Sequence, residues 1–130
     1  MKQPSYKDLR FDPSTIINLE KGKLPPQAID LEEVVLGAMM IDKKGVDEVI
    51  DILTPESFYK EIHQNIFDAI FKLFQRSEPI DLLTVSNQLK KDGTNDKVGG
   101  DLYLISLTQK VSSSAHIEFH ARIILQKFIQ

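Results

Sequence analysis

Three histidines are the side chains in this sequence best suited to acid–base or metal chemistry: His63, His116 and His120. The last two are four residues apart, so one face of a helix would carry both. In the zinc metalloprotease pattern an acidic residue directly follows the first histidine, whereas Glu118 stands one position later here. Two ligands do not make a catalytic zinc site. We therefore expect His116 and His120 to face solvent or a partner, and His63 to make a capping or core-edge hydrogen bond.

Paired carboxylates occur twice, at Glu32/Glu33 and at Asp47/Asp51. General acid–base catalysis needs two carboxyl groups held in different environments at a cleft. Asp47 and Asp51 are one turn apart on the polar side of a short amphipathic segment, which favours a solvated face over catalysis. The segment 42–45 offers too few oxygen ligands for a calcium loop.

The sequence contains no glycine-rich phosphate loop ending in Lys and Ser or Thr, so it lacks the nucleotide site of P-loop enzymes. Its glycine-containing segment 93–100 is flanked by acidic residues that would repel phosphate. There is no cysteine, which removes thiolate chemistry and Cys-based zinc sites and fits a reducing compartment such as the cytoplasm. We expect no catalytic residue, cofactor or metal in this chain.

The elements that must position these residues belong to a single domain. The chain has 130 residues, of which 42% are hydrophobic and 27% charged, a composition typical of a folded protein. Residues 1–26 carry a net charge of +2, whereas 27–130 carry −5. An acidic domain is a poor match for nucleic acid, which is bound through basic surfaces. No apolar run approaches the ~18 residues of a membrane span.

The first 26 residues contain Pro4, Pro13 and the Pro25-Pro26 pair and show no lasting apolar period. We expect a flexible N-terminal arm over 1–26, mobile as far as about Leu24. If the arm docks, its apolar residues would make the contacts: Phe11, Ile16, Ile17 and Leu19.

Residues 27–130 are predicted to be all-α, a compact bundle of about six short helices. Helix one spans about 30–42 and begins at a capping box of Asp30 and Glu33. Helix two contains Val46 to Leu53 and ends at Thr54-Pro55, where a brief turn runs to Phe58. Helix three, from Ile62 to Phe74, has the longest apolar stripe and is expected at the centre of the core.

Asp81 is expected to cap a fourth helix that ends at Gly93. A loop over 93–100 leads to a fifth helix that contains Leu102, Ile105 and Leu107. Ser113 or Ser114 caps a sixth helix that runs to the C-terminus. Its residues Ile117, Ala121, Ile124 and Phe128 share one sector, predicted to pack on helices three and five. Phe119 and Ile123 point nearly opposite. Two interpretations stay open for this pair: incidental exposure, or contact with another subunit or primase, with Tyr103 as a weaker candidate for such a contact.

Five sequence pieces occur in an order typical of one family. They are Leu24-Pro25-Pro26; 36–42, LGAMMID; 58–67, with Phe58-Tyr59, His63 and Ile66-Phe67; 79–85, PIDLLTV; and 98–104, with Val98-Gly99-Gly100 and Tyr103-Leu104. Over Leu24 to Gln130 the chain resembles the N-terminal domain of the bacterial replicative DNA helicase, the DnaB family. His116 and His120 depart from residues common in that family. Gly37, inside helix one, is expected at a close helix crossing.

The resemblance implies a non-catalytic collar domain that self-associates into dimers and, in the whole helicase, a hexamer. It implies docking of the C-terminal domain of primase, and a helicase loader as a further partner. It also implies that ATP, magnesium and DNA are bound by a separate RecA-like motor domain outside this chain, and that the last helix leads into a truncated helical hairpin.

Two other functions remain open from the residues. The chain could be the helicase-binding domain of a primase, whose fold is similar, although the polar start at Met1 favours a native beginning. It could also be a free-standing helical nucleic-acid-binding module that uses helices three and four, against which the acidic charge argues. A small acid–base enzyme is a remote fourth possibility.

Overall fold

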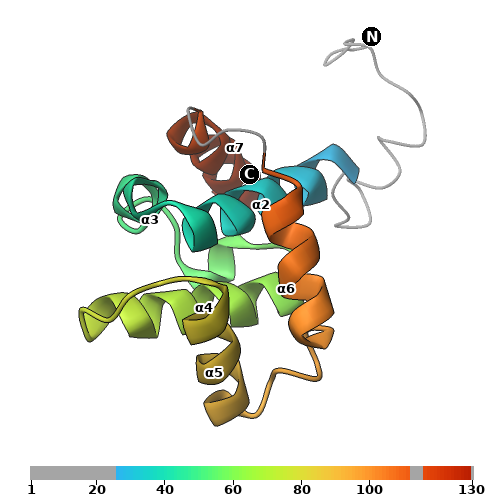
Figure 1. The fold of residues 1–130 in the computed structure, drawn as a ribbon. Helices are drawn as coiled ribbons and strands as arrows, with labels where there is room; N and C mark the ends of the chain where they lie inside the picture. The colour runs from blue at the N-terminus through green and yellow to red at the C-terminus, as the bar shows by residue number, and fades with distance from the viewer. Residues whose placement is uncertain (1–25, 112–115, 130) are drawn as a thin grey trace, which may run out of the picture.

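The computed structural model describes residues 26–111 and 116–129 and shows an all-helical domain (Figure 1). Its described part contains six α-helices and one 3-10 helix. In chain order these are α2 (Pro26–Ile41), α3 (Lys43–Val49), η1 (Pro55–Ser57), α4 (Glu61–Gln75), α5 (Leu82–Asp92), α6 (Gly100–Gln109) and α7 (Ile117–Ile129). The all-α prediction is confirmed. Of the predicted arm over 1–26, residues 1–25 lie outside the described residues, whereas Pro26 is already the first residue of α2. The predicted caps Ser113 and Ser114 also lie outside the described residues.

Helix α2 is the centre of the domain, because it packs against every other described α-helix. All side chains from Val35 to Met40 are buried, around the whole circumference of the helix. A helix that is apolar on all sides is typical of a central position. We predicted that the third helix would occupy this place; the structure gives it to α2, with α3 and α7 on one side and α4 and α5 on the other (Figure 1).

The crossing of α2 and α6 is very close at Gly37, as the sequence predicted. A Cβ atom at this position would lie 2.1 Å from the carbonyl oxygen of Leu107 and 2.8 Å from Cγ2 of Val111. Only a residue without a side chain allows the two backbones to approach in this way.

The first helix begins earlier than predicted. α2 starts at Pro26, so Asp30 lies inside the helix and the predicted Asp30–Glu33 capping box is wrong. Proline is favoured in the first turn of a helix because it needs no partner for an N–H group. Asp42 ends the predicted first helix and instead caps α3, where its carboxylate accepts a hydrogen bond from the backbone N–H of Lys44 at 2.9 Å.

Local signals fixed the other boundaries better. Thr54 and Ser57 form a capping box on η1. Asp81 and Thr84 do the same on α5, which ends at Gly93 in the left-handed conformation, φ 77°. The second helix is shorter than predicted. α3 ends at Val49, so Leu53, which we predicted inside this helix, lies beyond its end, although it is still buried.

The fifth helix is found as α6, which contains Leu102, Ile105 and Leu107 as predicted. Leu104 and Leu107 are buried, whereas Leu102 is 81% exposed. We predicted that α7 packs on α4 and α6. It packs instead on α2, α3 and η1. Among the described residues, no helix is both long enough and apolar enough to cross a membrane.

Candidate interaction site

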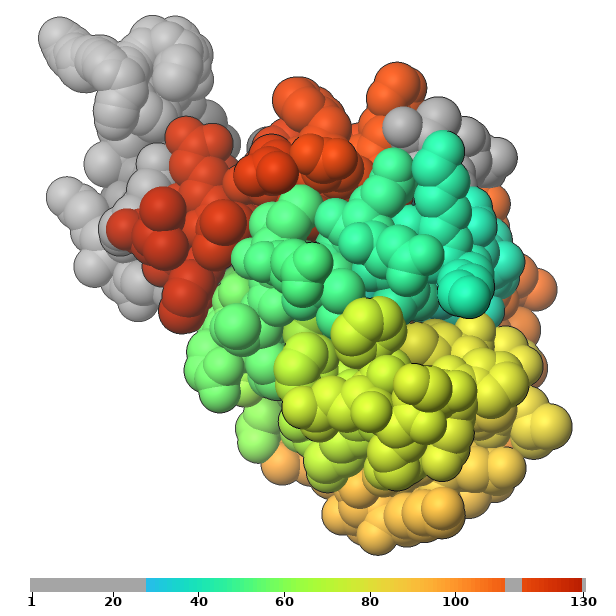
Figure 2. Space-filling view, turned by 90° about the vertical axis from the view of Figure 1, so that its left-hand side faces the viewer, coloured from blue at the N-terminus to red at the C-terminus, as the bar shows by residue number. Residues whose placement is uncertain are grey.

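Helix α7 presents an apolar surface on the side away from the core. Ile117, Ala121 and Ile124 are buried against the domain, as predicted. Phe119, on the other side, is 65% exposed, and Ile123 is partly exposed. The space-filling view shows α7 in red at one end of the molecule, next to the segment of α3 and η1 (Figure 2).

Phe128 was predicted to pack with the buried sector of α7, but half of its surface is exposed. Ile129 beside it is 70% exposed. Complete burial on α7 therefore ends with Ile124, and Leu125 after it is partly buried against the core. The last turn adds two further apolar side chains to the accessible surface of the helix.

His116 lies just before α7 and His120 lies in its first turn, and they form no metal site with the residues that the structure describes. The rings of His116 and His120 lie edge to face with their centroids 6.5 Å apart. His116 is exposed and His120 partly exposed. No group of three or more metal-ligating side chains occurs in the described segments.

His63 and Tyr103 belong to a chain of polar side chains inside the domain. Nδ1 of His63 lies 2.6 Å from Oε1 of Glu32, and its Nε2 lies 2.6 Å from the hydroxyl of Tyr103. The Tyr103 hydroxyl in turn donates to Oε2 of Glu33 at 3.2 Å. Nζ of Lys110 lies 3.0 Å from Oε1 of the same carboxylate. We call these five residues, Glu32, Glu33, His63, Tyr103 and Lys110, the buried polar chain after its inner end; Glu33 and Tyr103 are partly exposed, and Lys110 lies at the surface.

The buried polar chain joins three helices, since its members come from α2, α4 and α6. Its inner end is shielded from water: His63 is 0% and Glu32 1% exposed. The second oxygen of Glu32 accepts a hydrogen bond from the backbone N–H of Tyr59 at 2.7 Å. The hydrogen bond predicted for His63 is confirmed, but its place is deep in the core and not at the edge.

Charge and burial change the acidity at the outer end of this chain. Burial and the neighbouring carboxylate of Glu33 raise the pKa of Tyr103, so its phenol stays neutral. The hydrogen bond with Glu33 raises the pKa of Lys110, which stays charged. The Tyr103 hydroxyl is therefore occupied within the domain, and its partner contact, which stays a prediction, would use the partly exposed ring.

Sequence reasoning considered Glu32 only as half of a carboxylate pair and missed its partnership with His63. No local signal marked Glu32, because Asp30 and Glu33 are acidic residues of the same helix. The identity of the partner depends on contacts between residues 31 positions apart, which periodicity does not reveal.

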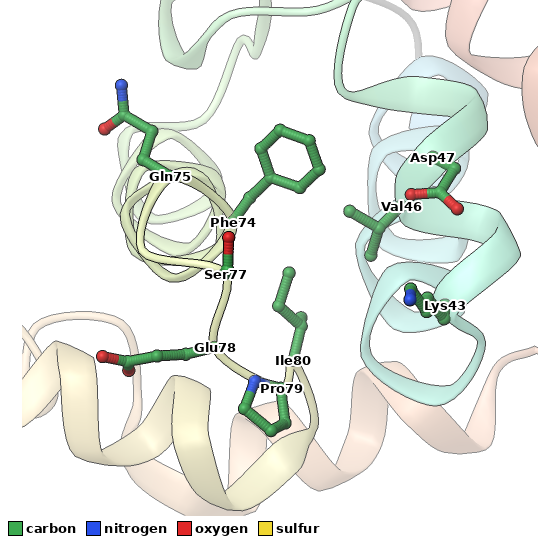
Figure 3. Close-up of a pocket in the computed structure, with 9 residues that line it drawn as sticks. All are labelled: Lys43, Val46, Asp47, Phe74, Gln75, Ser77, Glu78, Pro79 and Ile80. Atoms are coloured by element: carbon green, nitrogen blue, oxygen red, sulfur yellow. The ribbon is translucent and has the colours of Figure 1, made fainter.

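An open pocket lies between α3 and the turn that joins α4 to α5 (Figure 3). The side chains of Val46, Phe74 and Ile80 point toward one another across it, with Pro79 at its edge. Phe74 is 39% exposed. Asp47 and Lys43 stand at the α3 side of the pocket, so Asp47 lies at a surface as predicted, and not in a cleft shaped for acid–base catalysis.

A separate pair of exposed leucines lies at the first turns of α5 and α6. Leu83 is 69% and Leu102 81% exposed. Near them, the hydroxyl of Ser86 donates to Asp101 at 2.6 Å and holds the two helices together.

Comparison with known proteins decides the family. Residues 24–126 match the DnaB-like helicase N terminal domain. The chain belongs to this family. The DnaB-like match begins at the first of the five sequence pieces quoted above and ends inside α7, so it includes the exposed Phe119 and Ile123 as well as the whole buried polar chain.

Curated relatives are replicative DNA helicases. The DnaB-like chain is 44% identical over 114 residues to the replicative DNA helicase DnaB of Rhodothermus marinus. This match covers 88% of this chain and 12% of that protein. It is 38% identical over 107 residues to the DnaB helicase of Geobacillus stearothermophilus, covering 82% of this chain and 24% of the relative. The chain thus spans between about an eighth and a quarter of the length of these helicases.

The fold agrees with a solved structure of the same family. The crystal structure of the N-terminal domain of DnaB helicase from Mycobacterium tuberculosis matches with a TM-score of 0.73 and 36% sequence identity. The match covers 76% of this chain and 72% of that one. The resemblance to the DnaB family is confirmed, and with it the expected helical N-terminal domain of a replicative helicase.

Proposed function

We propose that this DnaB-like domain is a non-catalytic assembly and docking domain of a replicative DNA helicase. It self-associates into dimers and, within the whole helicase, contributes to a hexamer. It receives primase through the C-terminal domain of primase, and a helicase loader is a further partner. The observation that carries this proposal is the two-sided apolar character of α7.

The inner side of α7 is already satisfied by the domain. Ile117, Ala121 and Ile124 are buried, so the apolar residues on the other side are not needed to complete the core. Phe119 is 65% exposed and Ile129 70% exposed. Aromatic and aliphatic side chains grouped on an accessible helix face are typical of protein interfaces. Charge supports the same view, because an acidic domain favours protein partners over DNA.

The chemistry of the helicase belongs to another part of the protein in this proposal. The sequence has no phosphate loop, so ATP and magnesium act in a RecA-like motor domain, and DNA is contacted only through the full-length protein. The alternative of a primase fragment is weaker than it was from sequence alone, because the curated relatives quoted above are helicases.

The double substitution Phe119→Ser with Ile123→Ser tests the proposed interface. Because Phe119 is largely exposed and Ile123 partly so, we expect the circular dichroism and melting temperature of this chain to stay nearly unchanged. Self-association of the intact helicase, measured by sedimentation velocity, should weaken. Leu83→Ser with Leu102→Ser is the matched control, since both leucines are exposed on other helices. It should leave self-association as it was.

Three results would contradict this assignment. Unfolding of the domain by the α7 substitutions would show that Phe119 and Ile123 belong to the core. Unchanged self-association would show that they are exposed but make no contact between subunits. An equal loss in the Leu83/Leu102 control would remove any special role of α7. Primase docking is tested separately by calorimetric titration of this chain with the C-terminal domain of primase, where an absence of binding would contradict that part of the proposal.

A further inference from the structure

The pocket between α3 and the turn from α4 to α5 contains apolar surface that the described part of the domain leaves uncovered. Its volume is about 910 Å³, which is large enough for a short peptide segment. Phe74 keeps 39% of its surface exposed, and Val46 and Ile80 point toward it across the pocket (Figure 3). An incoming apolar side chain would bury this surface and be stabilised by doing so.

The wall formed by the turn between α4 and α5 is fixed by the domain itself. The backbone N–H of Ser77 donates to the carbonyl oxygen of Phe74 at 3.0 Å and closes the end of α4. Pro79 then restricts the backbone that leads to Ile80. A pocket whose walls are set before binding loses little free energy to reorganisation when it is filled.

The rim of the pocket carries one charge of each sign. Lys43 and Asp47 are exposed on α3, one helical turn apart, and neither has an ion pair with any residue that the structure describes. Glu78, the other charged residue of the lining, pairs with Arg76 at 3.0 Å. An apolar side chain with a basic residue on one side and an acidic residue on the other therefore suits this pocket.

The N-terminal arm of the same chain contains such a sequence. Phe11 stands between Arg10 and Asp12, and an aromatic ring buries a large apolar area. Because a proline follows Asp12, an extended backbone is favoured there, which places Arg10 and Asp12 about 7 Å apart. Lys43 and Asp47, one turn apart on a helix, have a similar separation of about 6 Å.

The arm is long enough to bring Phe11 to the pocket. Fifteen residues lead from Phe11 to Pro26, and such a length can span about 50 Å. The pocket begins at Lys43, just beyond the end of α2, and the 16 residues of α2 extend over about 24 Å. The charges of +2 on 1–26 and −5 on 27–130 favour the approach. Tethering raises the effective concentration, so a weak contact is sufficient.

We propose that residues 10–12 of the same chain occupy this pocket, with the ring of Phe11 against Phe74 and Ile80. The buried apolar surface of Phe11 supplies the binding. The two charges beside it orient the segment and add little to stability, because exposed ion pairs are weak. This site is separate from the interface proposed on α7, since no residue of that helix lines the pocket.

Nuclear Overhauser spectra of the methyl-labelled chain of 130 residues test this contact. We expect cross-peaks between the ring protons of Phe11 and the methyl groups of Val46 and Ile80. In Phe11→Ala these cross-peaks are lost and the two sets of methyl signals shift, while the methyl signals of Leu102, exposed on α6, keep their positions. Ile17→Ala, in the same arm, is the matched control and should leave all of these signals unchanged.

Three results overturn the proposal. The first is an absence of cross-peaks from Phe11 to the pocket in the native chain, which decides even if Phe11→Ala does not fold. The second is an equal shift of the Val46 and Ile80 signals in Ile17→Ala, which would show no preference for the aromatic residue. The third is the appearance of the cross-peaks only between differently labelled chains in a mixed sample, because the occupant would then come from a second copy.

Discussion

Gly37 carries a constraint that its position in a helix would not suggest. Alanine normally favours a helix over glycine by about 1 kcal/mol. At this position, however, the added Cβ would lie 2.1 Å from the carbonyl oxygen of Leu107, and a backbone atom cannot move aside as a flexible side chain can. The close crossing of α2 and α6 therefore depends on the absence of one methyl group.

Gly37→Ala is expected to destabilise the domain by about 1–3 kcal/mol, as overpacking does. Urea unfolding followed by circular dichroism measures this directly. Asp30→Ala on the same helix, at an exposed position, is the control and should change the free energy of unfolding by less than about 0.5 kcal/mol. A stabilised Gly37→Ala protein would mean that helix propensity outweighs the crossing.

Asp101 links stability to acidity. Hydrogen bonds from Ser86 and Asn95 hold the pKa of its carboxyl below the ordinary 3.8. A carboxyl group whose pKa is lower in the folded chain than in the unfolded chain stabilises the fold when it is ionised. This stabilisation is lost as the pH falls through the lowered pKa. Asp101→Asn should therefore show a smaller loss of melting temperature than the native chain between about pH 5 and about pH 3. Asp47→Asn, without a hydrogen bond to any described residue, should follow the native curve.

Single residues were the level at which sequence reasoning was most uneven. The close crossing at Gly37 and the capping role of Asp81 were predicted, because each can be inferred from neighbouring residues: a glycine inside an apolar helix, and an aspartate just before a helix. The burial of Glu32 and its pairing with His63 were not, since nothing near either residue in the sequence names the other. The partner roles of Phe119, Ile123 and Tyr103 stay predictions.

Among the helices, α5 has the most completely specified ends. Its N-cap Asp81 accepts from the backbone N–H of Thr84 at 2.9 Å, while the Thr84 hydroxyl accepts from the backbone N–H of Asp81. Gly93 supplies the left-handed residue at the other end. These signals lie within a few residues of the boundary, which is why the sequence could predict both ends of this helix.

Asp81→Ala is expected to cost about 1 kcal/mol through loss of the cap, with faster amide exchange in the first turn of α5. Thr84→Ala removes the reciprocal bond and should show a smaller effect in the same place. Exposed Leu83→Ala, between them, is the control. Equal exchange rates in all three variants would show that packing alone sets the start of α5.

The start of α2 shows why a similar pattern misled. Asp30 and Glu33 have the spacing of a capping box, but the helix begins one turn earlier at Pro26. The spacing of polar residues inside a helix can match that of a cap by chance. Only the backbone before Asp30, which is already helical, separates the two cases.

For the molecule as a whole, the sequence predicted the class of fold and not its arrangement. The apolar stripes of α4 and α7 were located correctly except at their ends, where Phe74 and Phe128 are exposed. Even so, α7 packs on α2 and α3 instead of α4 and α6. Periodicity shows which side of a helix is buried and says nothing of the helix that covers it. The central place of α2 follows from burial on all its sides, which weakens the very periodicity used to predict it.

The whole chain is expected to hydrolyse no ATP, because it lacks a phosphate loop. A coupled assay on the purified chain, with magnesium present, should give the rate of the buffer. The intact helicase, assayed beside it, is the positive control. Turnover that co-purifies with the chain and persists in repeated preparations would contradict the non-catalytic role.

The buried polar chain also bears on the order of events during folding. Its hydrogen bonds join residues 31, 40 and 70 positions apart along the chain. Each of them needs two separate helices to have met, and the complete set needs all three. Contacts of such long sequence separation are completed late, after local helices and the first apolar contacts. Interactions that are absent from the transition state slow unfolding and leave the folding rate nearly unchanged. We therefore expect the polar chain in the core to slow unfolding of the domain more than it slows folding.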